Sequence, residues 1–114
     1  MIPWMLLATA RTPGNGVELR LYQRDTEFSI KAGNHELMNS HAHESEDALA
    51  RLTCQKITRQ PRTRVLIGGL GMGYTLRSAL NELEANSQVV VAELVPEVVQ
   101  WNRGVLANFG RSSA

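Results

Sequence analysis

The sequence contains little of what marks the specialised protein classes: it has one cysteine, few aromatic residues, almost no net charge and no long apolar run. The lone Cys54 excludes an intrachain disulfide and favours a reducing compartment. Twelve basic and eleven acidic residues give a net charge of +1 without a basic stripe, so a nucleic-acid partner is not expected. The opening segment, MIPWMLLATA, is too short to span a membrane, and no Lys or Arg precedes it as in a signal peptide. We therefore expect a small cytoplasmic domain, or part of a larger protein, with no membrane partner.

Single residues with chemical potential mostly favour structural roles. Cys54 falls in a helical pattern beside Ala50, which indicates a buried thiol rather than a nucleophile. Trp4 and Trp101 are expected in a core rather than at a ligand, and Arg77 in solvent. Three histidines could suggest a metal, but no cysteine or fourth ligand has useful spacing, so a solvated polar junction is favoured and no metal site is expected. They are His35, His41 and His43.

The first forty residues carry strand and turn signals. The segment Thr12–Gly16, TPGNG, is a strong turn between a candidate strand, WMLLA, and an alternating run, VELRLYQ. EFSIK repeats the alternation, and AGN turns the chain into HELMN. The positions expected to face inward are Val17, Leu19, Leu21, Phe28 and Ile30. Residues 1–43 are therefore predicted to form a small antiparallel β-meander.

From Ser45 onward the pattern changes to alternating helices and strands. Ser45 is expected to cap a helix over 45–57, with apolar positions at Leu49, Leu52 and 56/57. A polar connector, RQPRTR, leads to the apolar strand RVLIGG, the helical segment TLRSALNELEAN, the strand QVVVAEL and a helix beginning at Pro96. Uninterrupted apolar strands are typical of a parallel sheet covered on both faces. The predicted fold class is α/β, with residues 44–114 forming a linking helix and the first βαβα part of a Rossmann-like, methyltransferase-like sheet.

The glycine-rich segment between the first parallel strand and the next helix predicts a ligand-binding loop. Gly69, Gly71 and Gly73 form G-x-G-x-G, which permits positive φ and a close approach of the backbone to a ligand. A dinucleotide fingerprint would need glycine where Tyr74 stands. The spacing matches instead the nucleoside-binding loop of enzymes that use S-adenosylmethionine.

An acidic residue completes the predicted site. Glu93 ends the second strand, twenty residues after Gly73, where a carboxylate can accept both hydroxyls of a ribose. The alternative is that the glycines form only a tight turn and that Glu93 is a solvated strand end. The ligand-binding residues predicted are Gly69, Gly71, Met72, Gly73, Tyr74 and Glu93.

These segments resemble the spermidine/spermine synthase family of polyamine aminopropyltransferases. VLIGGLGMGYTLRSAL is similar to the glycine-rich segment of that family, and VVVAELVPEVVQWNRG is similar to its second strand and helix. The meander followed by ELMNSHAHESEDALA resembles the small β-domain and linking helix of the family, in which His43 could approach a site. The resemblance implies transfer of an aminopropyl group from decarboxylated S-adenosylmethionine to an amine in polyamine biosynthesis. It implies no metal and no tightly bound cofactor.

Departures from the family pattern leave the activity open. Met72 stands where the family has the aspartate that holds the aminopropyl tail. Ser45-Glu46-Asp47 lies near the family's acidic pair, but the following Tyr-His-Glu is replaced by 48–51, ALAR. The later strands that carry the catalytic aspartate have no counterpart. Three predictions therefore stay open. The first is a truncated, nucleoside-binding transferase domain, incomplete for catalysis, that binds S-adenosylmethionine or its decarboxylated form. The alternatives are a non-catalytic, self-associating module and a methyltransferase-like domain.

A sheet of two parallel strands would also expose an edge of unpaired backbone groups beside Val, Ile and Leu side chains. Such an edge favours pairing with another chain. We therefore expect a homo-oligomer, specifically a dimer that buries this edge.

Overall fold

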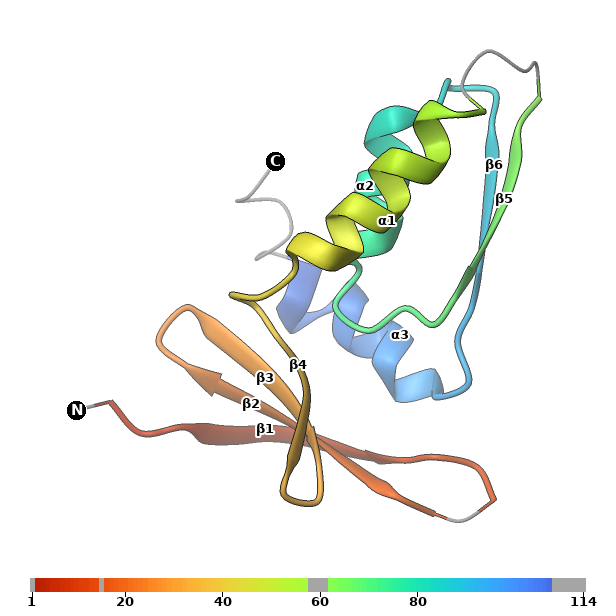
Figure 1. Cartoon of the computed structure of the whole chain (residues 1–114). Coiled ribbons are helices and arrows are strands. Elements are labelled where there is room, and N and C mark those ends of the chain that lie inside the picture. The colour runs from red at the N-terminus through yellow and green to blue at the C-terminus, as the bar shows by residue number, and fades with distance from the viewer. Residues whose placement is uncertain (1, 15, 58–61, 108–114) are drawn as a thin grey trace. The chain divides into compact units, whose positions relative to one another are not determined.

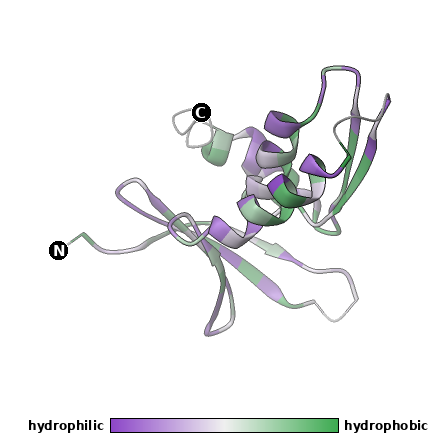
Figure 2. Ribbon diagram, turned by 45° about the horizontal axis from the view of Figure 1, so that its top comes forward, coloured by the Kyte–Doolittle hydropathy of each residue, from purple (hydrophilic) through white to green (hydrophobic). Residues whose placement is uncertain are grey.

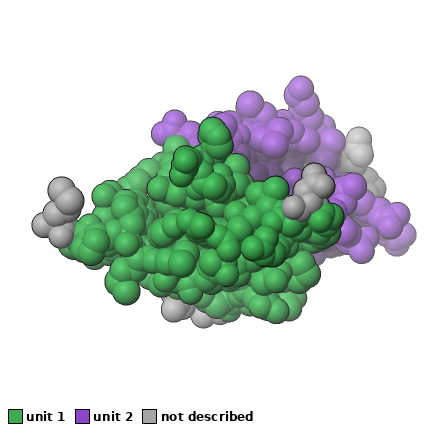
Figure 3. Space-filling model, turned by 90° about the horizontal axis from the view of Figure 1, so that it is seen from below, with its two compact units in different colours: residues 1–42, 94–114 green, residues 43–93 purple. Residues whose placement is uncertain are grey.

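The structure, a computed structural model, is a mixed α/β protein and describes residues 2–14, 16–57 and 62–107 (Figure 1). Contacts divide the chain into two compact units (Figure 3). Unit 1 comprises residues 1–42 and 94–114, and unit 2 comprises residues 43–93. The break after residue 42 lies one residue from the predicted boundary, whereas residues from Leu94 onward group with the meander and not with the glycine-rich segment.

Unit 1 contains the predicted antiparallel meander. Its four strands pair in chain order, each antiparallel to the next. The unit also contains α3, which begins with a proline at its first turn as expected. The elements are β1 (Met5–Arg11), β2 (Glu18–Arg24), β3 (Glu27–Ala32), β4 (His35–Asn39) and α3 (Pro96–Arg103).

The alternating pattern of β2 and β3 correctly predicts four buried apolar residues of the meander, although it does not predict that Ser29 between two of them is buried as well. Leu21 lies opposite Ile30 in the register, and neither side chain is more than 3% exposed. Leu19 and Phe28 are also buried. Val17 is 47% exposed, because it precedes the first residue of β2 and is not held by the ladder. The expectation that Val17 faces inward is therefore wrong.

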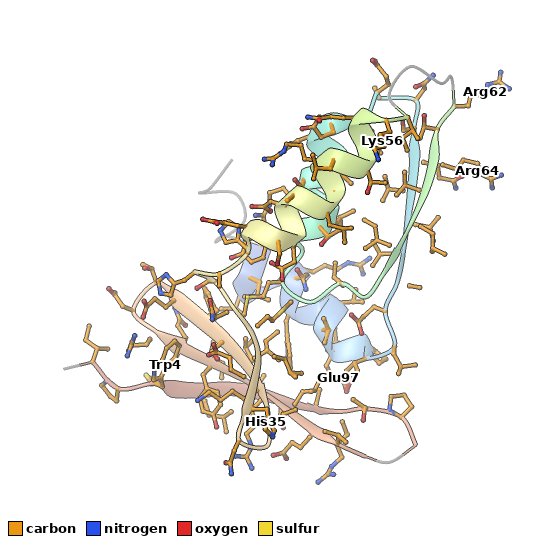
Figure 4. All side chains as sticks on the ribbon, in the orientation of Figure 1. Trp4, His35, Lys56, Arg62, Arg64 and Glu97 are labelled. Carbon is orange, nitrogen blue, oxygen red and sulfur yellow. The ribbon has the colours of Figure 1, made fainter. Side chains whose placement is uncertain are left out.

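The two tryptophans differ in burial. Trp101, on α3, is 8% exposed, which confirms the expectation for it. Trp4 precedes β1 and is 36% exposed, with the Arg24 guanidinium 4.5 Å from its ring centroid (Figure 4). Trp4 is thus not a core residue. Phe109, expected on the last helix, lies outside the described residues, as do the first three residues of the RQPRTR connector and Asn15 of the predicted turn.

Unit 2 contains two helices and a parallel pair of strands. These are α1 (Glu44–Gln55), β5 (Arg64–Gly68), α2 (Tyr74–Glu82) and β6 (Gln88–Ala92). Both helices lie on the same side of the strand pair (Figure 1). Ala50 and Cys54 of α1, Ile67 of β5 and Ala79 of α2 form the buried cluster between the layers. The expectation of a buried Cys54 is confirmed.

Two expectations for α1 are corrected by the structure. The helix is capped by His43 rather than Ser45, and no side chain makes the capping hydrogen bond. Its leucines, Leu49 and Leu52, are 63% and 55% exposed. Small side chains face the sheet instead, because they allow the helix to approach the strands closely.

Within the described residues of unit 2, the parallel sheet has one covered face and not two. Val65 and Val89 pack toward the buried cluster, whereas Leu66 is 73% and Val90 49% exposed. The apolar runs in both strands are visible in Figure 2. Uninterrupted apolar sequence predicted burial on both sides, but both helices of unit 2 lie on the same side.

Candidate functional site

The glycine-rich loop connects the end of β5 to the start of α2 through three left-handed residues. The φ angles of Gly69, Gly71 and Gly73 are +90°, +55° and +81°. Side chains with a β-carbon rarely adopt these values, so the alternation of glycines is a requirement of the backbone. A β-carbon built on Gly69 would meet no atom within 4 Å. Space is therefore open beside the main chain at the start of the loop.

Glu93 lies at this loop. Its Oε1 accepts a hydrogen bond from the Leu70 N–H at 2.7 Å, across a sequence separation of 23 residues. A second link, from the Gly69 N–H to the Ala92 carbonyl at 2.8 Å, joins the loop to the end of β6. Because β5 and β6 are parallel, their carboxyl ends meet at one edge of the sheet. The structure thus brings the predicted acid and glycine loop together.

The side chains of the loop are largely buried. Met72 is 2% and Tyr74 3% exposed. Burial raises the pKa of Tyr74 to about 12, with Asp47 and Glu46 adding to the rise and Arg77 opposing it. A ligand at this loop would therefore meet main-chain groups and Glu93, and not the thioether or the phenol.

Tyr74 is held by His43, which the family resemblance placed near a site, and by Arg77, which was expected in solvent. The His43 ring stacks on the Tyr74 ring, with centroids 4.0 Å apart and planes within 9°. His43 Nδ1 is 2.7 Å from Asp47 Oδ2, and the Arg77 guanidinium lies 5.3 Å from the Tyr74 ring centroid. Arg77, expected in solvent, is half-buried. The family resemblance suggested that His43 could approach a site, but no signal in the sequence specified its contact with Tyr74.

The helix α2 directs its N-terminus at the same loop. Gly73 is its N-cap, no side chain caps it, and its first turn contains no acidic residue. The partial positive charge of a helix N-terminus is therefore not offset by an acidic side chain of its own first turn. An anionic or lone-pair-bearing ligand group would be stabilised there.

Other candidate groups do not assemble into a site. His41 pairs with Glu27 in unit 1, whereas His43 belongs to unit 2. Within the described ranges, no group of three or more His, Cys, Asp or Glu side chains is arranged to hold a metal ion. Burial raises the pKa of the Cys54 thiol, which disfavours the reactive thiolate.

Comparison with known protein families and with curated proteins finds no match to this chain. In the part of the chain that the structure describes, none of the helices is both long and apolar enough to cross a membrane.

Proposed function

We propose that unit 2 is the first part of a Rossmann-like domain that binds a nucleoside of the S-adenosylmethionine class. The observation that carries the proposal is the hydrogen bond from the Leu70 N–H to Glu93, which fixes an acid beside a glycine loop at the carboxyl ends of two parallel strands. Ligands of open α/β sheets bind at this end of the strands.

Each part of the site has a role in this proposal. Glu93 accepts hydrogen bonds from the ribose hydroxyls, since both oxygens of a carboxylate are acceptors. The open main chain at Gly69 lies along the sugar. The N-terminus of α2 stabilises the carboxylate of an amino-acid tail, if the ligand has one. A decarboxylated tail would lack this interaction.

The reaction class follows the resemblance to polyamine aminopropyltransferases, with Met72 as the point of departure. Met72 is buried and carries no charge, so its side chain cannot pair with the ammonium group of an aminopropyl tail. Methyltransferase-like chemistry is the alternative, and non-catalytic self-association is a second candidate function. The exposed edge of β5, described below, favours the second candidate.

Titration calorimetry tests the proposal. The ligands are S-adenosylmethionine, its decarboxylated form and methylthioadenosine, which share a nucleoside and differ in the tail. We expect all three ligands to bind if recognition is centred on the ribose. Differences between their affinities would show what the tail contributes to binding. No heat with any of them would contradict nucleoside binding.

Two variants separate loss of binding from loss of fold. Glu93→Gln keeps an oxygen for the Leu70 N–H but removes the charge, so it should weaken binding about tenfold, from about 1.5 kcal/mol per charge-assisted hydrogen bond. Glu84→Ala, at an exposed position outside the loop, is the matched control and should bind normally. Circular dichroism of each variant checks the fold.

A further inference from the structure

The free edge of β5 is defined by two hydrogen bonds at its ends. The Gln88 N–H donates to the Thr63 carbonyl, and the Gly69 N–H donates to the Ala92 carbonyl, each at 2.8 Å. Backbone groups of successive residues in a strand point to opposite edges, so the odd-numbered residues of this strand face β6. The N–H and C=O groups of Arg64, Leu66 and Gly68 therefore point away from β6. Among the described residues, none hydrogen-bonds to these groups.

A groove of about 220 Å³ runs along the β5 side of unit 2. Its lining is mostly apolar and comes from α1, α2 and the length of β5, with Leu49 and Leu66 among the exposed side chains. Arg64 is the charged residue of this strand, and Figure 4 shows it projecting away from the helices. The edge thus combines unpaired backbone groups with uncovered apolar surface, which soluble sheets avoid.

We propose that two copies of this chain pair through β5, antiparallel about a twofold axis that passes at Leu66. In this register Leu66 lies opposite Leu66 of the second copy, and Arg64 lies opposite Gly68. Every outward N–H and C=O group of the strand then has a partner. The arginine faces a glycine and meets no like charge, and the two leucines bury one another.

The register also determines how the helices of the two copies are placed. Opposed residues in an antiparallel pair have side chains on the same face, so α1 and α2 of both copies cover one face of a continuous four-stranded sheet. Leu49, which lines the groove, then lies beside the interface between the two β5 strands in both copies. A shift by one residue would turn the helices of the second copy to the opposite face and leave outward groups unpaired.

The free edges of β6 and β1 fit a second copy less well than that of β5. On β6 the outward groups belong to Val89 and Val91 alone, so pairing there would form fewer hydrogen bonds. The edge strand β1 is part of a four-stranded antiparallel sheet and has an irregularity in register between Leu6 and Ala8. A bulge protects an exposed edge because it twists the edge strand away from a partner, whereas a two-stranded sheet is rarely stable alone.

Sedimentation equilibrium of the full chain over a range of concentrations tests the dimer. We expect the mass to rise with concentration toward twice the 12.6 kDa of one chain. Leu66→Lys places two like charges at the axis and should abolish the rise. The exposed controls Val90→Lys on β6 and Leu6→Lys on β1 should leave it unchanged. A monomer at every concentration, or dissociation by a control but not by Leu66→Lys, would overturn the proposal.

A cysteine cross-link tests the register. Hydrogen-bonded residues opposed in an antiparallel pair have Cα atoms about 5.5 Å apart, a distance that a disulfide spans. Leu66→Cys should therefore oxidise to a covalent dimer, whereas Val90→Cys should not. The native Cys54 is 1% exposed and serves as an internal control in both variants. A cross-link through Val90→Cys alone would overturn the β5 assignment. This proposal does not depend on nucleoside binding.

Discussion

At the scale of residues, the positive φ angles of the three loop glycines could be predicted because the requirement for them is local. A turn from a strand into a helix with G-x-G-x-G spacing needs positive φ at alternate positions, and all three residues have it. The contact between Leu70 and Glu93 was implied only through the fold, since it spans 23 residues. The stack of His43 on Tyr74 was not predictable, because neither residue belongs to a motif that specifies the other.

The neighbouring glycines at the end of β5 allow a matched test of backbone strain. Gly69→Ala should destabilise the protein by about 1–2 kcal/mol, because its φ of +90° is unfavourable for an L-residue. A β-carbon at Gly68 would also meet no atom within 4 Å, but Gly68 does not have a positive φ. Gly68→Ala should therefore change the free energy of unfolding by less than about 0.5 kcal/mol. Urea denaturation measures both. Equal effects would mean that the loop does not have this backbone conformation.

The raised pKa of Tyr74 predicts a loss of stability at alkaline pH. The phenol is neutral and buried in the folded protein, with a pKa of about 12 against an ordinary value of 10.0. The folded state therefore binds this proton more tightly, and the free energy of unfolding should fall as pH rises from about 10 to about 12. Urea denaturation at several alkaline pH values measures the fall.

Tyr74→Phe isolates this contribution, because it keeps the ring against His43 and removes the ionisation. The variant should lose less stability than the wild type over the same range of pH. An identical fall in both proteins would show that other groups cause it.

At the scale of elements, the meander could be predicted because apolar and polar residues alternate along its strands and the apolar residues share one core. The helix α1 could not be predicted in the same detail. Hydrophobicity placed Leu49 and Leu52 inward, but Ala50 and Cys54 face the sheet. Small side chains give a weak pattern on a helix even where they determine which face packs. The same limit applies to β5, where apolar sequence did not reveal that Leu66 is uncovered.

Substitutions on the two faces of α1 should therefore affect stability in the opposite way to that predicted from side-chain hydrophobicity alone. Ala50→Leu adds volume to the buried cluster and should destabilise the protein by about 1–3 kcal/mol. Leu52→Ala removes an exposed side chain and should change stability by about 0.5 kcal/mol or less. Thermal denaturation at low concentration measures both. A larger loss from Leu52→Ala would place the leucine face in the core.

At the scale of the whole molecule, the near balance of charge determines how the exposed apolar surface behaves. The sequence pI is about 8.0, and apolar side chains are exposed on β1 in unit 1 and on β5 in unit 2. Self-repulsion is weakest where the net charge is zero, so association through such surfaces is strongest there. The two units thus each combine a small core with an uncovered strand edge.

Solubility should accordingly pass through a minimum near pH 8. Lowering the pH below the pI raises the net positive charge of the chain and with it the repulsion between copies. Light scattering at fixed concentration should be higher at pH 8 than at pH 6. A minimum of solubility near pH 5 would contradict this expectation.

The most direct test of nucleoside binding is an NMR titration of the full chain with methylthioadenosine. Nucleoside binding at this loop predicts saturable shifts of the Gly69, Leu70 and Gly71 amide resonances. Absence of shifts in the loop, or shifts confined to another part of the chain, would contradict it.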